Sequence, residues 1–303
     1  MPKFRCEIDD LLNFYKSTEI KFFTTKILTN YIDELVSIEN TSEQSLTFLT
    51  KPKYIAKSIN ELKGLVLIDV EISSYIDLDK MLCSYIVIDD ARYAFAAAHQ
   101  YIEKLGGGSG KELSHQIKSK FKSKIFKKSN VSQSIYIGEG TIIHPGVRLN
   151  GPIKIGKNSV IKANSVIGGK GFGFARRLGY PPMAMPSLGG VVIGDNVFVG
   201  SNCTIDQGTF ANTMISSDVK IDNGVHIAHN VIVSPRTIIT AHVEISGSTK
   251  IGSDTYIAPN VCIREGLEIG NNVLLGIGST VVKDVPDNAV AFGSPARIMR
   301  FQN

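Results

Sequence analysis

Aliphatic residues recur at every sixth position through the second half of the chain. The members of this series are Ile137, Ile143, Leu149, Ile155, Ile161 and Ile167, then Val192, Phe198, Thr204 and Phe210, and finally Ile215, Ile221, Ile227, Val233, Ile239, Ile245, Ile251, Ile257, Ile263, Ile269, Leu275 and Val281. Neither an α-helix nor a hairpin sheet has a six-residue period. A parallel β-helix with triangular coils does, because each hexad forms one flat side and about 18 residues complete one coil. The pattern therefore predicts a left-handed parallel β-helix.

Glycine often follows the aliphatic residue, as in "IGEG", "IGKN", "IGDN", "IGSD" and "IGNN". We expect these glycines to let the chain turn at the corners of each coil. The period is broken by the insertion "GGKGFGFARRLGYPPMAMPSLGG" at 168–190. Insertions in solenoids usually extend from one face, often the binding face. A loop at a contact between subunits is the other reading of this segment.

The period is absent before residue 130, where the chain reads as mixed α/β. "SLTFL" and "GLVLIDV" are strand-like, and "YAFAAAHQYIEKL" is helical. We expect a mainly β protein with an α/β domain at 1–104, a flexible glycine-rich and basic linker or helix at 105–130, and the β-helix at 131–303 with a short C-terminal tail. "GGGSGK" is not a phosphate-binding loop, because Glu112 follows its lysine.

Composition narrows the class of protein. Hydrophobic residues make up 43% and charged residues 20% of the chain, which is typical of a soluble globular protein. We see no secretory signal, no membrane-spanning run and no CxxC pair, so we expect a cytoplasmic protein. The run 111–128 carries seven lysines and one glutamate, which accounts for the net charge of +5. It predicts a solvated amphipathic helix or, at most, peripheral membrane or acidic-partner contact, and no nucleic-acid binding.

The stretch "NGVHIAHNVIV" at 223–233 carries two histidines on outward positions of the predicted coil. The inward positions around them are Ile221, Val225, Ile227 and Val231. One coil after His229 stands Gly247, which would leave a backbone N–H beside the imidazole. A neutral imidazole and a backbone donor have the parts for acyl transfer, as proton acceptor and oxyanion donor. Asp222, one hexad earlier, is a candidate for holding the imidazole tautomer. An ordinary surface histidine is the alternative.

Several segments resemble the UDP-3-O-acylglucosamine N-acyltransferases, left-handed β-helix enzymes of lipid A assembly. "TIDQGTF", "IDNGVHIAHN" and "ISGSTKIG" are similar to their catalytic coils, "GGKGFGFA" to their glycine-aromatic loop, and "SEQSLTFLTKPKY" to their uridine-binding segment. The resemblance implies a homotrimer with sites between adjacent subunits and a UDP-linked amino sugar as substrate. It implies no tightly bound cofactor; the donor would be the phosphopantetheine thioester of an acyl-carrier protein or a CoA thioester. It assigns His229 as general base, Asp222 as its partner and the Gly247 amide as oxyanion donor.

The same resemblance implies a set of substrate-binding residues. They are Phe48, Lys51 and Tyr54 in the uridine segment, Phe172 and Phe174 in the insertion, and Asn223 and His226 beside the proposed base. Phe48 and Tyr54 would stack on the uracil ring, with core packing as the alternative. Lys51 stands where the family usually has asparagine, and Gly266 stands where some members have a second active-site histidine. Arg176 or Arg177 of the insertion would contact the diphosphate.

The C-terminal sequence departs from this family. Its members end in helices that help recruit acyl-carrier protein, whereas here the chain ends at "AFGSPARIMRFQN". "GSPAR" is instead similar to CoA-dependent sugar acetyltransferases, which implies donor contacts at Gly293 and Arg297. Arg297 would meet a CoA phosphate or, alternatively, be a surface residue that closes the β-helix. An acetyl-CoA-dependent nucleotide-sugar N- or O-acetyltransferase of surface glycan synthesis is therefore the alternative function.

Two more distant functions remain open. Zinc carbonic anhydrases share the fold and place histidines at subunit interfaces, so His226, His229 and His242 invite comparison. The histidine spacing differs from that family's, and we expect no metal. A non-catalytic β-helix trimer is the other alternative, and it would be unchanged by His229→Ala.

Overall fold

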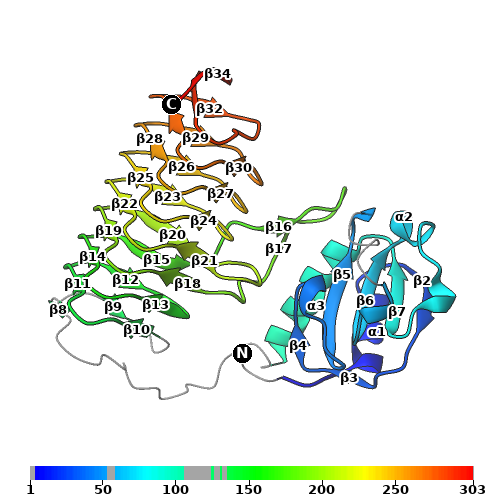
Figure 1. Ribbon diagram of the computed structural model, residues 1–303. Helices are drawn as coiled ribbons and strands as arrows, with labels where there is room; N and C mark the ends of the chain where they lie inside the picture. The colour runs from blue at the N-terminus through cyan, green and yellow to red at the C-terminus, as the bar shows by residue number, and fades with distance from the viewer. Residues whose placement is uncertain (1–3, 53–58, 106–123, 126–129, 132–134, 303) are drawn as a thin grey trace. The chain divides into compact units, whose positions relative to one another are not determined.

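The computed structural model describes residues 4–52, 59–105, 124–125, 130–131 and 135–302 (Figure 1). The chain divides into two compact units. The N-terminal unit comprises Met1–Leu113 and Gly173–Pro186, and the β-helix unit comprises Ser114–Phe172 and Ser187–Asn303. Most of the linker expected at 105–130 lies outside the described residues.

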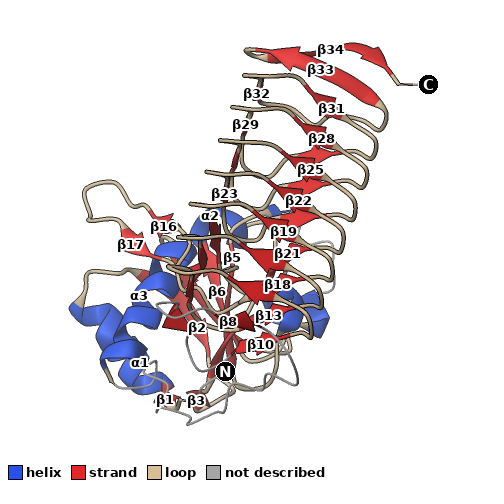
Figure 2. Cartoon of the chain, turned by 90° about the vertical axis from the view of Figure 1, so that its left-hand side faces the viewer, coloured by secondary structure: helices blue, strands red, loops and turns tan. Residues whose placement is uncertain are grey.

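The β-helix unit consists of three parallel sheets, and successive strands of the chain enter the three sheets in turn (Figures 1 and 2). The first sheet contains β10 (Ile135–Ile137), β13 (Ile153–Ile155), β18 (Val191–Ile193), β21 (Thr213–Ile215), β24 (Ile232–Val233), β27 (Lys250–Ile251) and β30 (Glu268–Ile269). The second contains β8 (Lys124–Ile125), β11 (Ile142–Ile143), β14 (Val160–Ile161), β19 (Phe198–Val199), β22 (Lys220–Ile221), β25 (Ile238–Ile239), β28 (Tyr256–Ile257), β31 (Leu274–Leu275), β33 (Ala289–Gly293) and β34 (Ala296–Phe301). The third contains β9 (Asn130–Val131), β12 (Arg148–Leu149), β15 (Val166–Gly169), β20 (Thr204–Asp206), β23 (His226–Ile227), β26 (Glu244–Ile245), β29 (Cys262–Ile263) and β32 (Thr280–Val281). The predicted left-handed parallel β-helix is confirmed.

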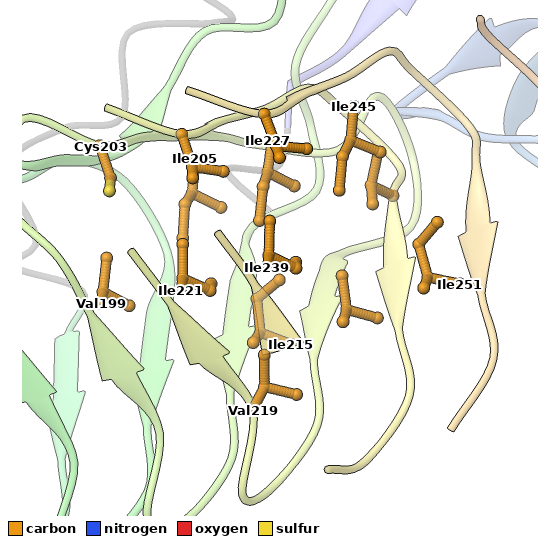
Figure 3. Packing of buried hydrophobic residues seen from close by; sticks show 14 of the residues in the cluster. Val199, Cys203, Ile205, Ile215, Val219, Ile221, Ile227, Ile239, Ile245 and Ile251 are labelled. Carbon is orange, nitrogen blue, oxygen red and sulfur yellow. The ribbon is translucent and has the colours of Figure 1, made fainter. Parts of the chain in front are cut away.

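The core of the β-helix is a set of aliphatic columns that run along its axis. Ile205, Ile227 and Ile245 are paired in register on consecutive strands and are fully buried (Figure 3). Burying an isoleucine side chain stabilises the fold by roughly 1.5–3 kcal/mol. Because the same position repeats in every coil, hydrophobic burial supports the whole solenoid.

One part of the predicted series was out of phase. Val192, Phe198 and Thr204 face outward, and Phe198 is 38% exposed. The buried residues of these strands are Ile193, Val199 and Ile205. Ile193 lies 26 residues after Ile167, which is not a multiple of six, and the predicted series resumed at Val192, one residue before the buried position. In a strand, a shift of one residue moves every side chain to the opposite face.

The corner glycines have a different role from the one predicted. Gly156 and Gly252 follow an aliphatic residue but do not adopt a positive φ. A Cβ on Gly252 would lie 2.4 Å from the backbone of Gly270 in the next coil, so glycine permits close stacking of the coils. The left-handed conformation falls two residues later, for example at Asn158 and Asp254. Asparagine and aspartate tolerate this conformation better than most residues.

The N-terminal unit is α/β, and its five-stranded sheet has the order β2-β7-β6-β5-β4. Its strands are β2 (Phe22–Lys26), β4 (Glu34–Leu35), β5 (Ser45–Leu49), β6 (Leu65–Asp69) and β7 (Ser84–Ile88), with a separate pair β1 (Cys6–Glu7) and β3 (Tyr31–Ile32). Its helices are α1 (Ile8–Ser17), α2 (Val70–Ser73) and α3 (Ala91–Lys104), with 3₁₀ turns at Ile38–Asn40, Ile59–Glu61 and Leu78–Lys80. β4 to β7 are parallel, whereas β2 runs antiparallel. The two strands and the helix predicted in this region are confirmed.

The central part of the insertion packs on the N-terminal unit. β16 (Phe174–Ala175) and β17 (Met183–Ala184) form an antiparallel hairpin that contacts α3. Arg177 Nη2 donates to Asp89 Oδ2 at 2.6 Å, and the guanidinium lies 4.1 Å from the centre of the Tyr180 ring. Tyr93 Oη donates to the Pro181 carbonyl at 3.3 Å. The insertion therefore leaves the β-helix unit at Phe172 and returns to it at Ser187.

The β-helix unit ends in a hairpin. β33 pairs in parallel with β31, and β34 pairs antiparallel with β33. Among the described residues, none of the helices combines the length and the apolar character needed to cross a membrane.

Candidate active site

His229 lies in the turn between β23 and β24, at the corner where the third sheet meets the first. A Cβ on Gly247 would lie 2.7 Å from its Cε1 and 2.8 Å from its Nε2. A Cβ on Gly171 would lie 2.8 Å from the His229 Cβ and 3.0 Å from Cδ2. The imidazole is therefore packed between two glycine backbones, and any larger residue at either position would displace it. Gly247 lies where the 18-residue stacking predicts, whereas the contact with Gly171 was not predicted.

Asn230 fixes the tautomer of this imidazole. Its Oδ1 accepts a hydrogen bond from the Thr209 N–H at 2.8 Å, which identifies that side-chain atom as the oxygen. The same oxygen lies 3.1 Å from His229 Nδ1. Because an amide oxygen only accepts, the proton of the neutral ring sits on Nδ1. Nε2, beside Gly247, is then free to accept a proton.

A second imidazole, that of His226, lies three residues before His229 in the same coil, and the Asp206 carboxylate lies one coil earlier. Thr204 Oγ1 is 2.6 Å from His226 Nδ1, and Asp206 Oδ2 is 3.9 Å from His226 Nε2. The Asp206 side chain is only 14% exposed. Burial raises the pKa of the Asp206 carboxyl above its ordinary value, while the charges of His226 and His229 oppose that rise. The third sheet therefore places a desolvated carboxylate 3.9 Å from the His226 imidazole, one coil before the coil that carries His229.

Asp222 lies at a different corner, where the second sheet passes into the third. Its Oδ1 accepts from the backbone N–H of Asn223 at 2.7 Å and from Asn223 Nδ2 at 2.8 Å. Asn223 Oδ1 in turn accepts from the Ser201 N–H at 2.8 Å. Within one chain β23 separates Asp222 from His229, so the expected intrachain dyad is not formed. A role for Asp222 at His229 stays a prediction for an assembly of several chains.

His242 shares the corner of Asp222 and is exposed. A Cβ on Gly224 would lie 2.7 Å from His242 Nδ1. The three histidines considered for zinc thus occupy three places: His226 faces outward on the third sheet, and His229 and His242 lie at two different corners. Among the residues that the structure describes, no cluster of three or more histidine, cysteine or carboxylate side chains is arranged to hold a metal ion.

The described part of the predicted uridine segment begins just before β5 in the N-terminal unit and continues past the carboxyl end of that strand to Pro52. Phe48 is half-buried, and its ring centre is 5.0 Å from that of Phe95 on α3. Lys51 is exposed, and Tyr54 lies outside the described residues. Asp69 ends the neighbouring strand β6, and burial, then the charge of Asp90, raise the pKa of its carboxyl to about 6. The carboxyl ends of parallel strands are the usual ligand-binding edge of such sheets.

The residues of the insertion that were expected to contact substrate differ in their exposure to solvent. Phe172 is 87% exposed and Phe174 is 39% exposed. Arg177 is largely buried and engaged by Asp89, whereas Arg176 is exposed. Of the two arginines considered for a diphosphate, only Arg176 has an accessible side chain.

The predicted donor contacts lie in the terminal hairpin. Gly293 ends β33, and Arg297 is on β34, where both are exposed. Arg297 therefore both helps to close the β-helix and presents its guanidinium to solvent, so the two readings of this residue are compatible.

Sequence reasoning missed Asp206 and Asn230. Residues 207–212 form a loop that lengthens this coil, so Thr204 pairs with His226, 22 positions later instead of 18. Counting by 18 places Asp206 above Gly224, at the wrong corner. The position of Asn230 directly after His229 in "AHN" could have indicated its role. Its hydrogen-bond partner Thr209 lies in the 207–212 loop, however, and the repeat does not predict where that loop lies.

Two models of hexapeptide repeats match the chain. "Bacterial transferase hexapeptide (six repeats)" matches residues 134–169, and "Hexapeptide repeat of succinyl-transferase" matches residues 190–234. Both ranges fall in the β-helix unit, and the gap between them corresponds to the insertion.

Curated relatives include UDP-3-O-acylglucosamine N-acyltransferases. The protein from Pseudomonas fluorescens (strain Pf0-1) is 46% identical over 101 residues, which cover 33% of this chain and 28% of that protein. The protein from Pseudomonas paraeruginosa (strain PA7) is 44% identical over 100 residues, with the same coverage. The matched region thus spans less than a third of the length of these relatives.

Solved structures support the fold. UDP-N-acetylglucosamine acyltransferase from Campylobacter jejuni superposes with a TM-score of 0.50 at 21% identity, covering 60% of this chain and 75% of that one. The Arabidopsis UDP-N-acetylglucosamine acyltransferase gives a TM-score of 0.50 at 18% identity, covering 63% and 73%. The repeat models and these structures together show that the β-helix unit is built from hexapeptide repeats, and about a third of the chain is similar to UDP-3-O-acylglucosamine N-acyltransferases.

Proposed function

We propose that this protein transfers an acyl group from a thioester donor to the amine of a UDP-linked amino sugar. The observation that carries the proposal is the His229 imidazole, which is held between two glycine backbones with Nε2 available as a base. The curated relatives, whose printed name is UDP-3-O-acylglucosamine N-acyltransferase, supply the substrate class.

The reaction follows from this geometry. The amine nitrogen of the sugar attacks the thioester carbonyl carbon, and His229 Nε2 takes a proton from that nitrogen. The Gly247 N–H, which has no acceptor among the described residues, donates to the developing oxyanion. The tetrahedral intermediate then collapses, the C–S bond breaks, and the proton on the imidazolium passes to the leaving thiolate. An amide and a free thiol are the products.

The N-terminal unit would bind the nucleotide. Phe48 and Lys51 lie at the carboxyl end of β5, where a parallel sheet ordinarily binds ligands. The Phe48 side chain is partly exposed and its aromatic ring suits stacking on uracil, and the Lys51 ammonium is exposed for a phosphate. Phe172, exposed near Gly171, would contact the acyl chain.

The assembly would be a homotrimer. The outer face of the second sheet carries Phe198, Ile238 and Tyr256, each between 38% and 42% exposed, and Lys220 lies between Phe198 and Ile238 in the strand register. Apolar side chains exposed on one face in this way are typical of an interface between copies of a chain. Trimerisation would also bring Asp222 of one copy towards His229 of another, which one chain does not do. Light scattering that shows only a 32.9 kDa monomer at micromolar concentration would count against this assembly.

Two donors fit the chain, an acyl-carrier protein and an acyl-CoA. The exposed Arg297 at the end of the β-helix favours the CoA arm, because its guanidinium suits a phosphate. With acetyl-CoA the protein would be a nucleotide-sugar acetyltransferase, and the pathway would be surface glycan synthesis instead of lipid A assembly.

A mass-spectrometric screen tests the proposal. The purified protein is incubated with UDP- and dTDP-linked amino sugars and with acyl-CoA or acyl-carrier-protein donors of several chain lengths. We expect one nucleotide sugar to gain the mass of one acyl group, and His229→Ala to abolish that product at equal protein concentration. Product formation that is equal in wild type and His229→Ala contradicts the proposal.

A further inference from the structure

Asp206 occupies an unusual place for a carboxylate on the outside of a β-helix. It ends β20 on the third sheet, yet its side chain is only 14% exposed. Gly169 is its partner on the neighbouring strand, and a Cβ there would lie 3.0 Å from Asp206 Oδ1. Desolvating a carboxylate is costly unless other groups compensate for it. The chain therefore maintains a buried negative charge directly beside the corner of His229.

The charged groups that act on Asp206 are the His226 and His229 imidazoles and the Glu244 carboxylate, which lies opposite His226 on the next strand. His226 Nε2 lies 3.9 Å from Asp206 Oδ2, and His226 Nδ1 lies 2.6 Å from Thr204 Oγ1. When the threonine hydroxyl donates to Nδ1, the proton of the neutral ring is on Nε2 and faces the carboxylate. His226 is thereby held in one orientation on one side of Asp206. The strand register pairs Thr204 with His226 and Ile205 with Ile227, so the same register carried one residue further places Asp206 beside Ala228, the residue before His229.

The neighbour that sets the His229 tautomer cannot supply this charge. Asn230 orients the ring but is neutral, so it does not offset the positive charge that appears when Nε2 accepts a proton. Asp222, the other carboxylate considered, lies at another corner of the same chain and is exposed. Asp206 is the buried carboxylate next to the base, and charge interactions are stronger where water is excluded.

We propose that Asp206 is a positioning residue for acyl transfer, whose carboxylate stabilises the protonated form of His229. The assignment rests on the proposed function. The two roles that a single carboxylate has in a catalytic triad would here belong to two different side chains. Asn230 sets the tautomer, and Asp206 supplies the negative charge.

The substitution Asp206→Asn tests the proposal, because it keeps the shape and removes the charge. A nearby carboxylate favours the protonated form of an imidazole by about one pH unit or more. We expect the low-pH limb of the kcat profile to move to lower pH by about one unit and the plateau kcat to fall about 10- to 100-fold with little change in KM. Asp206→Glu, which retains the charge, should leave the limb near its wild-type position. Glu139→Gln, an exposed charge change at another corner, is the matched control.

A second readout does not depend on catalysis. The His229 imidazole is titrated by NMR in the wild type and in Asp206→Asn, with the resonance assigned by its loss in His229→Ala. We expect the imidazole to lose its proton at lower pH in Asp206→Asn than in the wild type and in Glu139→Gln. If Asp206→Asn does not fold, Asp206→Ser provides the neutral variant.

The two ways to fail are separate. Unchanged titration and an unchanged kinetic limb in a folded neutral variant overturn the role of Asp206 even if the protein transfers acyl groups. A wild type that transfers no acyl group overturns the proposed function, whereas the NMR comparison still decides whether Asp206 stabilises the protonated His229.

Discussion

Two corners of the β-helix each place a histidine against a glycine of an adjacent coil, yet only one of them has the features of a catalytic site. His229 packs on Gly247 and His242 on Gly224, each with about the same spacing to the position of an added Cβ. His229 is also covered by Gly171 and has the buried Asp206 nearby, whereas His242 is exposed. A histidine above a glycine is therefore a product of the repeat, and the insertion and the buried carboxylate distinguish the two corners.

The largest expected difference between the corners is in catalysis. His229→Ala should lower kcat by about 10²–10⁴-fold, the usual range for loss of a general base, and KM should change little. His242→Ala should leave both constants near the wild-type values. Steady-state kinetics of acyl transfer on the two variants make the measurement, with circular dichroism as a check on folding. Equal losses in both variants would remove the distinction between the corners.

Substitution of the glycine at each corner should also lower kcat more at the His229 corner than at the His242 corner. Gly247→Ala introduces a Cβ 2.7 Å from His229 Cε1 and so must displace the ring. A displacement of about 1 Å at a reacting group can lower the rate on the order of 10²-fold. Gly224→Ala should instead lower stability by about 1 kcal/mol, because Gly224 has a φ of 69°.

Thermal unfolding and kcat, measured on both variants, separate these effects. A normal kcat in folded Gly247→Ala contradicts the account of the His229 corner.

The corners should also differ in whether their carboxylates act within or between chains. We expect Asp222→Asn to lower kcat by about tenfold, less than His229→Ala, and only if a trimer forms. In mixed trimers of His229→Ala and Asp222→Asn chains, about a quarter of the subunit boundaries regain both residues, so activity should exceed that of either variant alone. Mixtures of His229→Ala and Asp206→Asn chains should show no such recovery, because Asp206 and His229 act within one chain. Recovery in both mixtures, or in neither, contradicts this distinction.

The smallest expected difference is in stability. Burial raises the pKa of Asp206 in the folded state, so folding favours its protonated form. The folded protein then loses stability as pH rises from the unfolded pKa of about 3.9 through the higher folded pKa. Asp206→Asn removes this penalty and should unfold at a higher temperature than the wild type at neutral pH, with the gain absent below pH 3.9 or so. Asp222→Asn should show no such gain. A lower unfolding temperature for Asp206→Asn at neutral pH would indicate a structural role instead.

The sequence predicted the β-helix because each coil repeats the same local requirement, an inward aliphatic residue at every sixth position. It also predicted the contact between His229 and Gly247, since no insertion separates these two coils. It did not predict the place of Asp206, because the loop at 207–212 changes the spacing from 18 to 22 residues. Long-range register in a solenoid is set by hydrogen bonding between coils, and an irregular loop hides that register from a residue count.

The insertion shows the same limit. Its glycines and aromatic residues indicated a binding role, but not that Gly171 packs on His229 or that Arg177 pairs with Asp89. Both contacts join residues that are more than 50 positions apart in the chain and follow no repeat. Such contacts depend on three-dimensional packing, which a periodicity does not encode.

Chemical rescue tests the role of His229 most directly. His229→Ala should leave a space between Gly171 and Gly247 in which added imidazole can accept the proton from the sugar amine. The measurement is the single-turnover rate of acyl transfer by His229→Ala and by His242→Ala at increasing concentrations of neutral imidazole. We predict that the His229→Ala rate rises with imidazole while the His242→Ala rate is independent of it. A His229→Ala protein that transfers acyl groups at the wild-type rate without imidazole would contradict the account.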